Sequence, residues 1–81
     1  MTPNEMAIIE ILKEIIRSRN LPVPEIMPST ALDAKLGLES LDFAELIVRL
    51  EEMTGKDPFA QGTETQIQTV SDLARLYDAA G

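Results

Sequence analysis

Apolar residues near the start of the chain recur at intervals of three and four, with charged residues on the opposite side. The apolar positions are Ile8, Ile9, Ile11, Leu12, Ile15 and Ile16. This spacing predicts an amphipathic helix that ends near Arg19. Thr2 is a suitable N-cap, Pro3 suits the first helical position, and Glu5 can complete a capping box with Thr2.

A second apolar stripe lies in the middle of the chain. It is formed by Phe43, Leu46, Ile47, Leu50 and Met53, all of which we expect in the core. The stripe predicts a helix that starts near Ser40 and ends before Gly55. Asp42 falls in its first turn, where the helix dipole favours a carboxylate, and Gly55 can adopt the left-handed conformation that ends a helix.

The end of the chain carries a third helical pattern. Thr69 is a suitable N-cap with Asp72 three residues later, and the predicted helix runs to Gly81. Its apolar face is formed by Val70, Leu73, Ala74, Leu76 and Tyr77.

A long connection separates the first two helices. Pro22, Pro24 and Pro28 each remove a backbone donor, so residues 20–39 do not continue a helix. Loops of this length usually have a function or contain a turn of their own, and we expect an ordered loop with a helical turn over 29–34. The apolar residues expected to hold it against the core are Leu21, Val23, Ile26, Leu32 and Leu36.

These elements predict an all-α fold. It is a small helical bundle of three main helices, with a long ordered loop between the first two. Residues 55–66 are polar and rich in turn formers, which adds at most a short further helix there. A chain of 81 residues is long enough for one core, so we expect a single domain over 1–81.

Charge and composition exclude several classes of function. Seven basic against fourteen acidic residues give a net charge of -7, which repels nucleic acid and favours basic partner proteins. The absence of Cys and His removes zinc sites, disulfides and imidazole-assisted nucleophiles, so we expect neither catalytic nor metal-ligating residues. No apolar run is long enough for a membrane span, and we expect a cytoplasmic monomer.

Ser40 stands between a glycine-containing loop end and an acidic helix. Taken alone, a serine in this place is most often an N-cap. The wider window matches the phosphopantetheine attachment motif Leu-Gly-x-Asp-Ser-Leu at Leu36, Gly37, Ser40 and Leu41, and thus resembles the acyl carrier protein family. Further matching positions, which extend the resemblance over nearly the whole chain, are Asp42, Glu45, Leu46, Leu50, Glu51, Glu52, Thr69, Val70, Asp72 and Leu73.

The resemblance implies that Ser40 receives a phosphopantetheine arm from coenzyme A through a phosphopantetheinyl transferase. The arm then carries an acyl cargo as a thioester. Without an imidazole in the chain, Ser40 is an acceptor for another enzyme rather than a nucleophile of its own.

The resemblance also implies that the second helix docks a ligase, synthase or transferase with a basic surface. The expected partner-binding residues are Glu39, Leu41, Asp42, Ala44, Glu45, Val48, Glu51 and Glu52. The alternative is a solvated helix face on which Leu41 and Val48 only flank the core. Two residues depart from the family: Glu39 replaces the usual Asp, and Arg49, which can pair with Glu45, interrupts the acids.

Other functions stay open at this point. An aminoacyl or peptidyl carrier loaded by an adenylating ligase has the same modified serine. An unmodified helical interaction module uses Ser40 only as a cap, and a carboxylate enzyme is the weakest alternative. Neither the cargo nor the cognate enzyme follows from the sequence.

Overall fold

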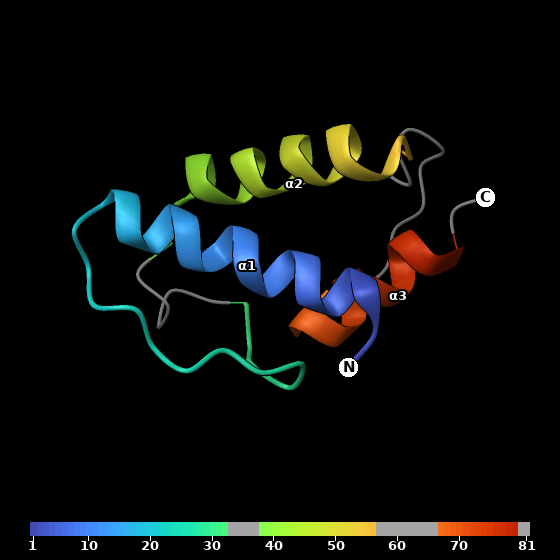
Figure 1. Ribbon diagram of the computed structural model, residues 1–81, viewed down its shortest axis with the longest axis horizontal. Helices are drawn as coiled ribbons and strands as arrows, with labels where there is room; N and C mark the ends of the chain where they lie inside the picture. The colour runs from blue at the N-terminus through green and yellow to red at the C-terminus, as the bar shows by residue number, and fades with distance from the viewer. Residues whose placement is uncertain (33–37, 57–66, 80–81) are drawn as a thin grey trace.

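Three helices form the described part of the protein. The computed structural model describes residues 1–32, 38–56 and 67–79. The helices are α1 (Pro3–Ser18), α2 (Ser40–Thr54) and α3 (Val70–Ala79), and α1 packs against both of the others (Figure 1). These residues contain no strand beyond an isolated bridge between Ala31 and Thr69. The predicted all-α bundle is therefore confirmed.

The first helix begins as its sequence predicts. The Thr2 hydroxyl accepts a hydrogen bond from the Glu5 N–H at 3.2 Å, and Glu5 Oε1 accepts one from the Thr2 N–H at 2.7 Å. The helix ends at Ser18, with Arg19 as C-cap. None of the helices among the described residues is long and apolar enough to cross a membrane.

The core forms where the apolar face of α1 meets the other two helices. Its members are Ile8, Ile9, Ile11, Leu12, Ile15, Ile16, Ile26, Leu38, Leu46, Leu50, Val70, Leu73, Ala74 and Tyr77. Burial of this apolar surface is the main stabilising contribution to a bundle of this size.

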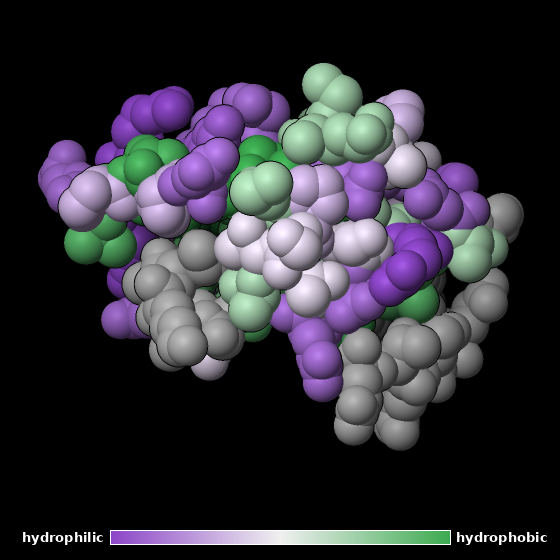
Figure 2. All heavy atoms as spheres, turned by 90° about the horizontal axis from the view of Figure 1, so that it is seen from below, coloured by the Kyte–Doolittle hydropathy of each residue, from purple (hydrophilic) through white to green (hydrophobic). Residues whose placement is uncertain are grey.

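The connection after α1 is held to the core by fewer residues than predicted. Ile26 is buried and Leu32 packs against the core, but Leu21 and Val23 are exposed, so their predicted core position is wrong. Both lie in a stretch without regular structure, from which prolines exclude a helix, and all residues from 21 to 25 are exposed. Seen from the side of this connection, apolar residues interrupt the hydrophilic surface (Figure 2).

The end of this connection pairs with the start of α3. The Leu32 N–H donates to the Gln68 carbonyl at 2.8 Å, and the Val70 N–H donates to the Thr30 carbonyl at 3.1 Å. Residues 28–32 form a turn and a bridge rather than a helix, because their backbone groups hydrogen-bond to residues 68–71. The predicted helical turn over 29–34 is wrong for 29–32, and 33–34 lie outside the described residues.

The second helix has the predicted bounds and one error in its predicted core. Leu46 and Leu50 are fully buried, whereas Phe43 and Ile47 pack at the edge of the core. Met53 is 60% exposed, so its predicted core position is wrong. Periodicity identifies the face of a helix but not where its neighbours end, and Met53 lies in the last turn on an open groove.

The third helix is capped as predicted. The Asp72 N–H donates to the Thr69 hydroxyl at 3.2 Å, and Asp72 Oδ2 accepts from the Thr69 N–H at 3.0 Å. Leu76 is half-buried at the edge of the predicted apolar face. The predicted helix end at Gly81, the short helix within 57–66 and the contact of Leu36 lie outside the described residues.

Candidate functional site

Ser40 is the first residue of α2, and its side chain is exposed. The N-cap is Glu39, with extended backbone angles of φ -109° and ψ 173°. The interpretation of Ser40 as an N-cap is therefore wrong. No described residue is hydrogen-bonded to the Ser40 hydroxyl, which leaves it accessible to another protein.

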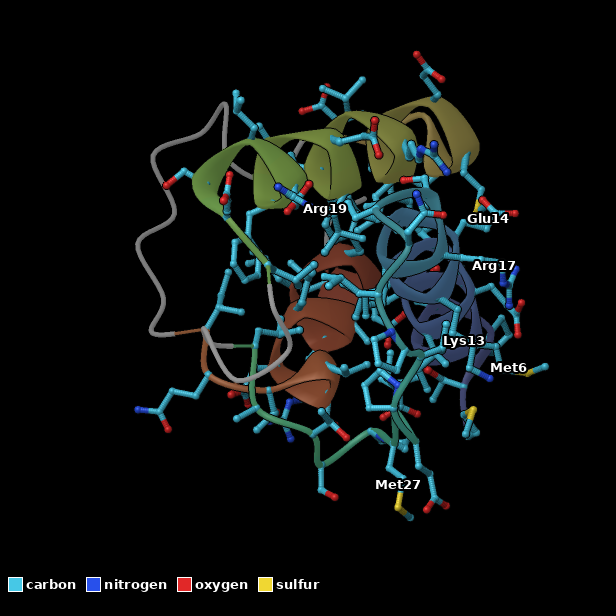
Figure 3. All side chains as sticks on the ribbon, turned by 90° about the vertical axis from the view of Figure 1, so that its left-hand side faces the viewer. Met6, Lys13, Glu14, Arg17, Arg19 and Met27 are labelled. Atoms are coloured by element: carbon cyan, nitrogen blue, oxygen red, sulfur yellow. The ribbon has the colours of Figure 1, made fainter. Side chains whose placement is uncertain are left out.

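Asp42 holds the start of α2 together. Its Oδ2 accepts hydrogen bonds from the Glu39 N–H at 2.9 Å and from Arg19 Nη1 at 3.1 Å, and its side chain is only 14% exposed. Arg19 Nη2 also lies 3.2 Å from Glu39 Oε2. Figure 3 shows Arg19 reaching from the end of α1 to the first turn of α2. One guanidinium group thus contacts both carboxylates beside Ser40 and offsets one of their two negative charges.

This geometry fits a phosphodiester at Ser40. The N–H groups of Ser40 and Leu41 donate to none of the described residues, and they lie at the positive end of the helix dipole. The carboxylates of Glu39 and Asp42 oppose an anion, but Arg19 offsets one of their two charges. A covalently held phosphate is therefore electrostatically acceptable here.

The side chains expected to bind partners are spread along α2. Leu41 is 80% and Val48 51% exposed, so neither packs against the core. Leu41 and Val48 lie about two turns apart on one face of α2, where an approaching protein can reach both. The remaining exposed members are Glu39, Ala44, Glu45 and Glu52, whereas Glu51 is half-buried.

Arg49 forms the ion pair that the sequence predicts and a second one that it does not. Its Nη2 lies 3.5 Å from Glu45 Oε2, one turn back on α2. Its Nη1 donates to Glu14 Oε2 at 2.8 Å, across to α1. Sequence reasoning missed Glu14 and Arg19, because nothing in the local pattern of α1 indicates which of its charges face α2.

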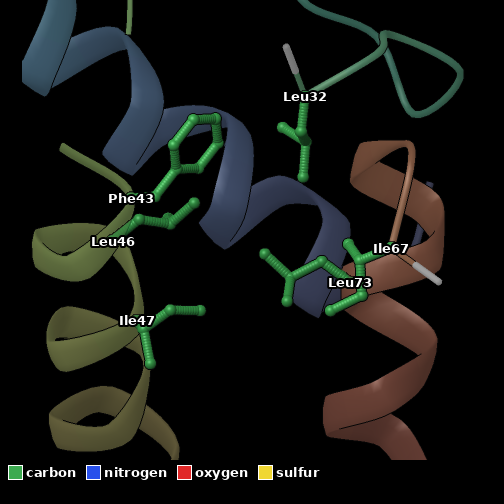
Figure 4. Close-up of a pocket in the computed structure, with 6 residues that line it drawn as sticks. All are labelled: Leu32, Phe43, Leu46, Ile47, Ile67 and Leu73. Atoms are coloured by element: carbon green, nitrogen blue, oxygen red, sulfur yellow. The ribbon is translucent and has the colours of Figure 1, made fainter. Parts of the chain in front are cut away.

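An apolar pocket opens between α2 and α3. Its volume is about 280 Å³. It is lined by Leu32, Phe43, Leu46, Ile47, Ile67 and Leu73 (Figure 4). Phe43 lies one turn beyond Ser40, so the pocket begins close to the accessible hydroxyl. Sequence reasoning missed Ile67, which belongs to no helical pattern.

Comparisons with known proteins agree with this geometry. Residues 7–77 match the family model of the phosphopantetheine attachment site. The chain is also similar to the solution structure of MacpD, an acyl carrier protein from Pseudomonas fluorescens involved in mupirocin biosynthesis. The TM-score is 0.78 with 34% sequence identity, over 93% of this chain and 68% of MacpD.

No curated protein matches the chain. The family match covers most of the sequence, and the carriers of this family are not catalysts. They bear phosphopantetheine as their cofactor, and their partners are the enzymes that modify them and process their cargo. The chain therefore belongs to the family of acyl carrier proteins that carry phosphopantetheine.

Proposed function

We propose that Ser40 is the residue that receives the phosphopantetheine arm and that residues 1–81 form one carrier domain working in the cytoplasm. The observation that carries the assignment is the exposed Ser40 at the start of α2, where the N–H groups of Ser40 and Leu41 donate to none of the described residues and the pocket-lining Phe43 follows three residues later. This combination suits a residue that is modified by another enzyme.

The transfer joins Ser40 Oγ to the pantetheine-bearing phosphorus of coenzyme A and breaks the bond from that phosphorus to the bridging oxygen of the diphosphate. Adenosine 3′,5′-bisphosphate leaves with the bonding electrons, and the hydroxyl proton passes to the transferase or to solvent. When bound, the arm supplies the thiol that forms a thioester, which the chain cannot supply because it has no Cys. Arg19 offsets the carboxylates of Glu39 and Asp42 beside the new phosphate.

The exposed side of α2 is the proposed docking surface for partners with a basic face. Its carboxylates, called the docking acids below, are the exposed Glu39, Glu45 and Glu52 and the partly buried Asp42 and Glu51. Leu41, Ala44 and Val48 provide apolar contacts between them. An apolar centre within a charged rim is the usual anatomy of a transient interface.

The pocket between α2 and α3 favours an acyl cargo over an amino acid. All of its described lining residues are apolar, so an ammonium or polar side chain finds no partner there. The likeness to MacpD supports a pathway of secondary metabolism. An aminoacyl or peptidyl cargo stays the alternative.

Intact mass after incubation with coenzyme A and a broad-specificity phosphopantetheinyl transferase tests the attachment site. We expect the wild-type mass to rise by one arm and Ser40→Ala to show no gain. Ser29→Ala, which removes another exposed serine, is the matched control and keeps the gain. An unmodified wild type, or a modified Ser40→Ala variant, contradicts the assignment.

Loading of the holo form separates the two cargo classes. We expect acyl-activating ligases to load the arm and amino-acid-adenylating ligases to load it poorly. Selective capture of amino acids would exclude the acyl assignment while leaving Ser40 as the attachment site.

A further inference from the structure

Glu39, Asp42 and Glu45, which belong to the docking acids, form ion pairs with arginines of the same chain. Arg19 contacts Glu39 at 3.2 Å and Asp42 at 3.1 Å, on either side of Ser40. Arg49 contacts Glu45 at 3.5 Å, one turn before it on α2. The acidic surface of α2 is therefore partly neutralised before any partner arrives.

Both arginines form ion pairs that link the α1 end of the chain to α2. Arg19 extends from the end of α1 to the start of α2, and Arg49 extends from α2 to Glu14 of α1. Their side chains are 32% and 40% exposed, so a protein approaching α2 can reach both guanidinium groups. Exposed ion pairs exchange partners at little cost.

We propose that Arg19 and Arg49 are specificity-determining residues that compete with the basic side chains of partner enzymes for the docking acids. This inference rests on the proposed function of α2 as the docking surface. A partner that uses Lys or Arg to contact Glu39, Asp42 or Glu45 must displace an internal guanidinium group or accept a weaker attraction.

The physical reason is that a carboxylate already in contact with a cation presents a smaller field to a second one. Partners whose binding depends on strong attraction to these carboxylates are disfavoured. Partners that bind mainly through the exposed Leu41 and Val48 lose little affinity. Selection among enzymes then depends on apolar contacts more than on charge. Like-charge repulsion between each arginine and a basic partner strengthens this discrimination.

Arg19→Gln and Arg49→Gln test the proposal directly. The partner used is a broad-specificity phosphopantetheinyl transferase, and each variant is used in its apo form. Calorimetry gives the Kd of the two proteins, and arm-transfer kinetics give KM and kcat. We expect Kd and KM to fall about threefold to tenfold at low ionic strength for both variants, because long-range attraction acts mainly on encounter. The kcat should be little changed for Arg49→Gln, whose ion pairs lie away from Ser40, whereas Arg19→Gln is judged by Kd alone, because Arg19 lies beside the new phosphate. The difference from wild type should disappear at high salt.

Two further variants separate competition from a loss of charge or of fold. Arg17→Gln removes the same charge from α1, but Arg17 lies on the outer side of the helix and has no ion pair among the described residues (Figure 3). It should leave Kd close to wild type. Arg19→Lys keeps the cation and should also stay close to wild type, and circular dichroism confirms that each variant is folded.

The outcomes distinguish this inference from the function on which it rests. If the wild type gains no arm, both the attachment site and this inference fail. If it gains the arm but Arg19→Gln and Arg49→Gln bind no more tightly than Arg17→Gln, only the inference fails. A weaker binding of the two variants, at any salt concentration, also overturns it.

Discussion

Glu5 is a buried charged residue in the first turn of α1. It also interacts with Ser71 of α3. Glu5 is only 9% exposed, and its carboxylate accepts a hydrogen bond from the Thr2 N–H at 2.7 Å. That bond, helped by hydrogen bonds from Ser71 and the Thr2 hydroxyl, lowers its pKa below the ordinary glutamate value against the opposing effect of desolvation. The ionised form therefore belongs to the native structure.

Glu5→Gln should lower the melting temperature by several degrees at neutral pH. Because the pKa of Glu5 is lower in the folded chain, its ionised carboxylate stabilises the fold above the unfolded-state pKa. This contribution is lost as the pH falls through the folded-state value. The gap in melting temperature between wild type and variant should therefore shrink from about pH 7 to about pH 3.

Glu10→Gln is the matched control for Glu5. Its side chain is 72% exposed on the same helix, and its contact with Lys13 is 4.0 Å long. We expect a much smaller change in melting temperature at neutral pH. A gap for Glu5→Gln that widens in acid would contradict the assigned role.

Each helix ends or begins through a residue with a specific backbone role. Asp42 and Asp72 accept hydrogen bonds from N-cap N–H groups at the starts of α2 and α3. Gly55 ends α2 with φ +69°, and its N–H donates to the Glu51 carbonyl at 2.8 Å. A Cβ at position 55 would meet no atom within 4 Å. Only the left-handed backbone conformation therefore disfavours a larger residue there.

Gly55→Ala should cost about 1 kcal/mol of unfolding free energy, because an alanine disfavours the left-handed region. Gly55→Asn should cost less, since Asn tolerates this conformation better. Urea denaturation followed by circular dichroism measures both. Equal stability of Gly55→Ala and wild type would show that the end of α2 adjusts to another conformation.

The molecule as a whole carries an excess of negative charge. Fourteen acidic and seven basic residues give -7, and Arg19 and Arg49 compensate part of it between α1 and α2. Exposed ion pairs contribute only about 0–1 kcal/mol each. We therefore expect the net repulsion, rather than the ion pairs, to set the salt dependence of stability.

Adding NaCl should raise the melting temperature, because screening weakens the net repulsion more than it weakens the ion pairs. Differential scanning calorimetry from low to moderate salt measures this. Glu52→Gln, which removes an exposed acid, should show a shallower increase, and Arg17→Gln a steeper one. A melting temperature that falls at moderate NaCl would show that ion pairs dominate.

The sequence by itself determined the three helices, the start of each, the ends of α1 and α2, and the family of the chain. Periodic apolar residues and capping boxes such as Thr2 with Glu5 are local signals, which depend on neighbours within one or two turns. The attachment motif around Ser40 is also local, so its residues were recognisable before any packing was known.

Tertiary structure alone decided which residues meet across segments. The pairing of Arg19 with Glu39 and Asp42, the contact of Arg49 with Glu14, and the pocket between α2 and α3 join residues far apart in the chain. Exposure of Leu21, Val23 and Met53 likewise depends on where neighbouring segments end. A periodic pattern cannot carry this information, because the docking of one helix on another sets it.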